Sequence, residues 1–172
     1  YYFNGRGTDH GVGMSQYGAR GRANAGQTYQ QILSHYYTDT TLGNVDEHTV
    51  VRVQLAAAHV PTAGSPARIT ARSGQWSSDL FRDGSGRPLV FPADSSVSLG
   101  PGGGGWVATV RDAGGNVLAQ AATEDFVIEP AESATRLQMT WRDNVPKYNL
   151  YRRSFRLRVN GEGVQAVNIV SI

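Results

Sequence analysis

The chain has 172 residues, of which 40% are hydrophobic and 17% charged, and this composition excludes an intrinsically disordered protein. It contains no cysteine, which excludes disulfides, thiolate zinc sites and a cysteine nucleophile. The formal net charge is only +2, without the clustered basic patch that nucleic-acid binding needs, so no nucleic-acid partner is expected.

Two short helices are predicted in the first quarter of the chain. Ser15 can cap a helix that runs through about Ala25, with Gly26 as its C-terminal stop. Thr28 followed by Gln31 fits a capping box at the start of a second helix. Each cap provides partners for backbone N–H groups that the first turn of a helix leaves unpaired, so both starts are expected to be well defined.

The two predicted helices differ in composition. The second has one apolar face with i, i+3, i+4, i+7 spacing, formed by Tyr29, Ile32, Leu33 and Tyr36. The first contains Gly18 and Gly21, each of which weakens a helix by roughly 1 kcal/mol relative to alanine. These glycines indicate that another part of the protein packs closely against the first helix.

From Thr49 onward the hydrophobic pattern has period two, which is typical of strands. The strand candidates are TVVRVQLA, ARITAR, QWSSDLF, PLVF, WVATVRD, NVLAQA, FVIE and RLQMTWR. Two hairpins are expected, with turns at Ala113–Asn116 and Asn160–Gly163. The tract Gly100–Gly105 is interpreted as an interruption, either a mobile loop or a junction. The predicted fold is α+β and mostly β, a short helical pair followed by a β-rich body of antiparallel strands.

The histidines show no metal-ligand spacing, since no pair lies at i, i+4 and no HExxH motif occurs. We expect neither a metal nor a cofactor. His35 is interpreted as a helix-face histidine beside tyrosines, and His48 and His59 as solvated. The glycine-rich start has neither GxGxxG nor a Walker lysine, which excludes a nucleotide-binding phosphate loop. No apolar run approaches the roughly 20 residues of a membrane helix, so no membrane span is expected.

The stretch Gly5–Gly26 combines many glycines with a few polar side chains. Glycines allow the backbone to approach a flat ligand closely. His10, Ser15, Gln16 and Tyr17 offer hydrogen bonds and one stacking face, which is the chemistry that binds neutral sugars. Composition alone therefore gives one functional interpretation, a sugar-binding surface.

A structural interpretation stays open beside it, in which Met14 and Tyr17 belong to the core and the glycines serve tight packing. A serine nucleophile is disfavoured, because Ser15 lies near His10 but GMSQY is not the GxSxG elbow, and a helix cap explains this serine. The acidic residues are scattered, and their spacing indicates no acid/base pair for glycoside cleavage.

The stretch from Phe3 to Leu42 resembles the signature of the SpoIID/LytB family. The motif HGVGMSQYGA is intact as His10–Ala19, and ILSHYY is intact as Ile32–Tyr37. The chain departs from the pattern at Thr8-Asp9, where members usually carry an aromatic residue and a glycine. Asp9 either changes the entrance of the glycan-binding groove that the resemblance implies, or is a loop residue without a role in binding.

The resemblance implies a role at the bacterial cell wall, because the family includes peptidoglycan lytic transglycosylases of sporulating cells and amidase enhancers. It implies an exported protein of the cell wall or extracellular space, with peptidoglycan glycan strands as partners and a cell-wall amidase as a further one. The implied substrate-binding residues are His10, Ser15, Gln16 and Tyr17, with Arg6 as a weaker candidate.

For the transglycosylases, the family mechanism is acid-catalysed cleavage of the MurNAc–GlcNAc bond. The sugar's own 6-hydroxyl attacks to give an anhydro product, and one glutamate in a V-P-x-E-M-P stretch serves as acid and then base. That stretch is absent from the 172 residues. The chain alone is therefore expected to be inactive, and its partner would be the remaining SpoIID catalytic segment, on the same polypeptide or a second fragment.

The last part of the chain, LYRRSFRLRVNGEGVQAVNIVSI, resembles the family hairpin that lies just upstream of the catalytic glutamate, with Arg153 where glycine is common. The expected domains are a SpoIID-type signature segment (1–45), an inserted β-rich domain (46–144) and a hairpin that returns to the SpoIID core (145–172). We expect a permuted member whose catalytic segment follows Ile172. The alternative is a binding protein that has lost this segment.

Overall fold

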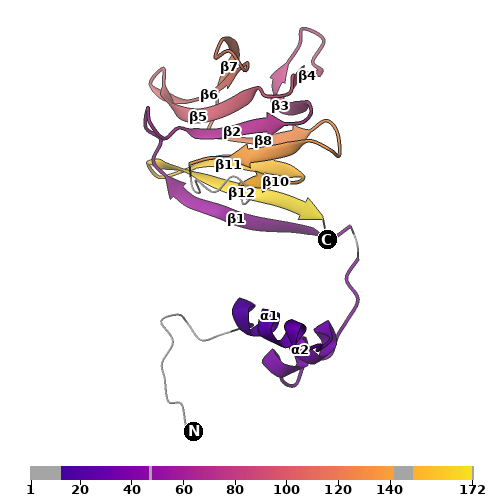
Figure 1. Ribbon diagram of the computed structural model, residues 1–172. Helices are drawn as coiled ribbons and strands as arrows, with labels where there is room; N and C mark the ends of the chain where they lie inside the picture. Colours follow the sequence, from indigo (N-terminus) through magenta and orange to yellow (C-terminus); the bar gives the residue numbers. More distant parts are fainter. Residues whose placement is uncertain (1–12, 47, 142–148, 172) are drawn as a thin grey trace. The chain divides into compact units, whose positions relative to one another are not determined.

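The computed structural model describes residues 13–46, 48–141 and 149–171. Contacts divide the chain into two compact units, Tyr1–Val45 and Asp46–Ile172. The first unit contains two helices, and the second contains the strands (Figure 1). The predicted fold class, α+β and mostly β, is confirmed. The boundary that was expected at residue 144 lies outside the described residues.

The first unit, which we call the helix-pair unit, contains α1 (Gln16–Asn24) and α2 (Tyr29–Tyr36). The Ser15 hydroxyl accepts a hydrogen bond from the Gly18 N–H at 3.1 Å, so Ser15 is the N-cap of α1 as predicted. Gly26 has a φ of +84°, a left-handed conformation that favours glycine and follows the end of this helix.

The start of α2 is a reciprocal capping box, as predicted. The Gln31 N–H donates to the Thr28 hydroxyl at 3.4 Å, and the Thr28 N–H donates to the Gln31 side-chain oxygen at 2.8 Å. Among the described residues of this unit, Ile32 is the one buried hydrophobic side chain. The helix pair therefore has a very small core, and its few specific contacts carry much of its structure.

The second unit is a sandwich of two six-stranded antiparallel sheets (Figure 1). The first sheet contains, in spatial order, β1 (Val50–His59), β12 (Gly163–Ser171), β11 (Ser154–Asn160), β8 (Asp125–Pro130), β3 (Trp76–Arg82) and β4 (Pro88–Phe91). The second contains β10 (Leu150–Tyr151), β9 (Arg136–Met139), β2 (Ala67–Arg72), β5 (Ser96–Gly102), β6 (Gly105–Arg111) and β7 (Val117–Ala122). Inward-facing side chains of both sheets form one core.

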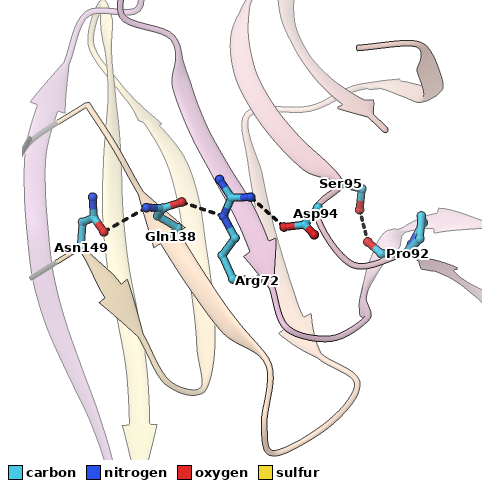
Figure 2. A network of polar contacts seen from close by, with 6 residues as sticks. All are labelled: Arg72, Pro92, Asp94, Ser95, Gln138 and Asn149. Carbon is cyan, nitrogen blue, oxygen red and sulfur yellow. Dashed lines mark hydrogen bonds and ion pairs between the residues drawn. The ribbon is translucent and has the colours of Figure 1, made fainter. Parts of the chain in front are cut away.

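Alternation along the strands produces this core. In β2 the buried residues Ala67, Ile69 and Ala71 alternate with more accessible ones, and in β11 Phe155 and Leu157 point inward. A network of polar side chains connects neighbouring parts of the second sheet, as Figure 2 shows. There the Arg72 guanidinium donates to Gln138 at 2.8 Å and to Asp94 at 2.7 Å, and Gln138 donates to Asn149 at 3.1 Å.

Both predicted hairpins are confirmed, but the interpretation of the glycine tract was wrong. Gly100–Gly102 belong to β5, Gly105 begins β6, and Gly102 pairs with Gly105 across a two-residue turn. Gly103 and Gly104 have φ values of +59° and +83°, which a tight hairpin turn of this hand requires. The tract is therefore a hairpin turn between neighbouring strands rather than a mobile loop or a junction.

The terminal hairpin, β11 and β12, is part of the first sheet. β12 pairs with β1 on one side and with β11 on the other, and β11 pairs in turn with β8. The strand β1 follows directly on the helix-pair unit in sequence, so the two ends of the second unit are neighbours in one sheet. The assignment of this hairpin to a SpoIID core stays a prediction.

An ion pair joins neighbouring strands on the outer face of the first sheet. The Arg156 guanidinium donates two hydrogen bonds to the Asp125 carboxylate, and this lowers the pKa of that carboxyl, while burial opposes the shift in part. A lowered pKa in the folded state adds stability above the unfolded value of about 3.9. That stability is lost as the pH falls through the folded pKa.

Replacing Asp125 with Asn is therefore expected to reduce the free energy of unfolding at neutral pH by less than about 1 kcal/mol, since the pair is partly exposed. Because protonation of Asp125 also weakens the pair, the difference between the two proteins should shrink as the pH falls below about 4. Urea denaturation at a series of pH values measures it. A difference that stays constant from neutral to acidic pH would contradict this account.

Candidate functional site

The candidate site lies at the start of α1, where Ser15, Gln16 and Tyr17 are consecutive. The Ser15 hydroxyl oxygen is held by the cap described above, so the first turn of α1 has a fixed beginning. The Tyr17 side chain is 84% exposed, and Gln16 is exposed as well. Gly13, two residues before the cap, has a φ of +87°, a conformation that favours glycine.

The structure does not support the interpretation that Met14 and Tyr17 belong to a core. Met14 is 38% exposed, and Tyr17 is among the most exposed large hydrophobic residues of the chain. A solvent-exposed tyrosine on a capped helix presents an aromatic ring from a backbone of defined conformation. Such a surface suits stacking on a flat ligand better than it suits a core.

Two tyrosines at the end of α2 hold the segment around the cap. The Met14 N–H donates to the Tyr37 hydroxyl at 3.2 Å, which connects the end of α2 with the approach to α1. The Tyr36 hydroxyl lies against Gly18, so close that a methyl group at this position would overlap the hydroxyl oxygen. The expected close packing at Gly18 is therefore confirmed. The expectation for Gly21 is wrong for the described part of the chain, where no atom lies within 4 Å of the place where its side chain would be.

Arg22 links the two helices through a polar cluster. Its guanidinium donates to the Gln27 side-chain oxygen at 3.0 Å and contacts His35 Nε2 at 2.7 Å, and it lies 5.9 Å from the centre of the Tyr36 ring. Because an arginine has no acceptor, His35 Nε2 is the acceptor in this contact. His35 also makes an edge contact with Tyr36, with ring centres 4.9 Å apart. The prediction of a helix-face histidine beside tyrosines is confirmed.

The structure brings together only part of the predicted site. Ser15, Gln16 and Tyr17 lie on one helical turn, whereas His10 and Arg6, together with Asp9, lie outside the described residues. The roles of Arg22 and Tyr37 were missed by sequence reasoning, because each contacts a residue far along the chain. Outside this unit, His59 is half-buried and stacks on Trp141, with ring centres 5.5 Å apart, so the prediction that it is solvated was wrong.

Within residues 13–46, 48–141 and 149–171, no group of three or more acidic or histidine side chains is placed to hold a metal ion. In the same part of the chain, none of the helices has the length and apolar character that crossing a membrane requires.

Comparison with known proteins gives matches that are short and specific. Over 42 residues, 24% of this chain, it is 57% identical to the amidase enhancer of Bacillus subtilis (strain 168). Over 41 residues it is 49% identical to stage II sporulation protein D of the same organism. The matched stretches span 6% and 12% of those two proteins. No family model and no solved structure matches the chain. The comparisons support the SpoIID/LytB resemblance over a short stretch.

Proposed function

We propose that this chain is part of a SpoIID-like cell-wall protein, in which the helix-pair unit binds peptidoglycan glycan strands. The observation that carries this proposal is the exposed Tyr17 ring on the first turn of α1. The short matches to the amidase enhancer and to stage II sporulation protein D support it. The proposal includes export to the cell wall or extracellular space, where the glycan strands are found.

The exposed groups around Tyr17 suit a neutral sugar. A tyrosine ring offers a flat apolar face to the C–H face of a pyranose, and the neighbouring Gln16 amide supplies two donors and an acceptor for hydroxyl groups. The Ser15 cap and the Tyr36 and Tyr37 contacts hold the backbone of this turn in place, so little backbone freedom would be lost on binding. His10 and Arg6 are retained in the proposal as further sugar-binding residues.

For the full-length protein we propose lytic transglycosylase activity, with the general-acid glutamate outside this chain. The glutamate donates its proton to the glycosidic oxygen as that oxygen leaves C1 of MurNAc. The 6-hydroxyl oxygen of the same sugar attacks C1, the glutamate takes up the hydroxyl proton, and a 1,6-anhydro ring results. In this reaction the helix-pair unit orients the strand and transfers no proton itself.

A second candidate function is a non-catalytic one, in which the protein binds the wall and assists a cell-wall amidase. The observation that favours it is the higher identity to the relative named as an amidase enhancer. The two functions differ in what the native protein does with purified glycan strands, since a transglycosylase releases anhydro-sugar products. An amidase enhancer releases none, and raises product formation only when an amidase is present.

Replacing Tyr17 with Ala is expected to weaken binding to purified glycan strands by about tenfold, because it removes the exposed stacking face. Co-sedimentation of the 172-residue chain with insoluble strands measures this. The matched control is Tyr29→Ala, which removes a 66% exposed tyrosine from the start of α2 and should leave binding unchanged. Equal losses in both variants, or no binding by the unmodified chain, would contradict the proposal.

A further inference from the structure

Three connections that cross between the two sheets of the sandwich meet at one end. They are residues 73–75 between β2 and β3, 131–135 between β8 and β9, and 152–153 between β10 and β11. The Gln75 carbonyl accepts hydrogen bonds from the Ala131 N–H at 2.9 Å and from the Thr135 hydroxyl at 3.1 Å. Gly74 packs against the same threonine, leaving no room for a side chain. The first two connections are therefore tightly joined.

A cavity of about 500 Å³ lies between the second and third connections. Five of the residues that line it are charged, which are Glu129, Glu132, Arg136, Arg152 and Arg153. Within the part of the chain that the structure describes, ion pairs join Arg72 with Asp94 and Arg156 with Asp125, and none joins two of the five cavity residues. Three positive and two negative residues thus line one cavity without forming an ion pair among themselves. Arg136 is half-buried, and the other four are exposed.

Arg136 is fixed on the wall of this cavity. Its guanidinium donates to the backbone carbonyls of Ser133, Ala134 and Thr135 at 2.8, 3.0 and 3.1 Å. These acceptors are neutral, so the positive charge of Arg136 is oriented without being cancelled. The same three hydrogen bonds give the connection from β8 to β9 a defined shape.

The Arg152–Arg153 turn is held by a buried amide. Asn168 is 6% exposed, and its side-chain nitrogen donates to the carbonyls of Arg152 at 2.9 Å and Ser154 at 3.0 Å. Arg153 has a φ of +64°, a left-handed conformation that favours glycine and is strained for a residue with a long side chain. An arginine at such a position adds a charge to the cavity at the expense of backbone strain, a combination that is common at binding sites.

We propose that this cavity binds a short zwitterionic peptide that carries several carboxylates and a free ammonium group. The planar guanidinium groups of Arg136, Arg152 and Arg153 match carboxylates, while Glu129 and Glu132 match an ammonium group. The two glutamates also disfavour a phosphate polymer, which carries negative charge alone. The stem peptides attached to glycan strands have this chemistry, and naming them as the source rests on the proposed cell-wall function.

The test is titration calorimetry of the 172-residue chain with the tripeptide L-Ala-γ-D-Glu-meso-diaminopimelate. Replacing Arg153 with Gly should weaken binding at least about tenfold, because one charged contact is lost. It should leave the melting temperature unchanged or raise it, because glycine relieves the strain at this φ. A purely structural arginine would give no loss of binding. The matched control is Arg158→Ala, which removes an exposed arginine of β11 outside the cavity.

Three results would contradict the proposal that this cavity binds such a peptide. They are the absence of tripeptide binding by the unmodified chain, equal binding by the Arg153→Gly variant, and binding of inorganic phosphate as tight as that of the tripeptide. Tyr17→Ala should leave tripeptide affinity unchanged, since Tyr17 is not among the residues that line the cavity. If the unmodified chain bound the tripeptide but not the glycan strands, that result would contradict the proposed function alone.

Discussion

Replacing Trp76 with Ala is expected to lower the free energy of unfolding of the β-sandwich by about 3–5 kcal/mol. Trp76 is 1% exposed, and its ring lies 4.6 Å from the Phe91 ring, centre to centre. Its indole N–H donates to the Ser95 hydroxyl at 2.8 Å, and that hydroxyl donates to the Pro92 carbonyl at 2.5 Å, a contact drawn in Figure 2. The substitution removes a large apolar volume and a buried hydrogen bond together.

The comparison variant Trp76→Phe keeps most of the ring volume and loses the indole N–H. It should lower the free energy of unfolding by about 1–3 kcal/mol, because the Ser95 hydroxyl then loses a buried donor. Chemical denaturation followed by tryptophan fluorescence measures both variants, since Trp106 and Trp141 remain as probes. A Trp76→Ala protein as stable as the unmodified chain would mean that this residue is not in the core.

Replacing Gly18 with Ala is expected to disrupt the helix-pair unit and with it glycan binding. The new methyl carbon would overlap the Tyr36 hydroxyl oxygen and lie 3.3 Å from the Ser15 Cβ, so Tyr36 must move. Overpacking of this kind destabilises by about 1–3 kcal/mol, a large fraction for a unit whose described core is Ile32. We expect glycan affinity to fall by at least about tenfold, together with part of the helical circular-dichroism signal.

The control is Gly21→Ala, a change of the same kind one turn further along α1. Among the described residues, no atom lies within 4 Å of the would-be methyl group at Gly21, so alanine there should stabilise the helix by about 0.5–1 kcal/mol. The two variants are therefore expected to change stability in opposite directions. If Gly18→Ala raised stability as Gly21→Ala is expected to do, that result would contradict the close packing of Tyr36 against Gly18.

The sequence predicted those helices and strands whose stabilising residues lie within a few positions of one another. The Ser15 cap and the Thr28–Gln31 box depend on side chains that reach their own helix start, so the sequence alone indicated them. Strands with strict alternation, such as β2 and β6, were predicted for the same reason. The two-residue turn at Gly103-Gly104 was not, because a run of glycines hides which two residues turn.

Features that depend on distant parts of the chain could not be read from the sequence. Arg22 contacts His35 only because α2 folds back along α1, and nothing local to either residue indicates the pair. The charged cavity is lined by residues of β8, β9 and the turn before β11. These segments come together only because the chain passes from one sheet to the other at this end of the sandwich. Tyr17 differs, since its motif indicated a binding role and the structure then showed its ring exposed.

The central claim is that the first turn of α1 contacts glycan strands. A nuclear magnetic resonance titration of the isotope-labelled chain with soluble, purified glycan fragments tests this most directly, because it reports each backbone amide separately. We predict that the largest shift changes fall on the amides of residues 13–20, and that Tyr17→Ala abolishes them. Shift changes confined to the β-sandwich, or none at saturating glycan, would contradict the claim.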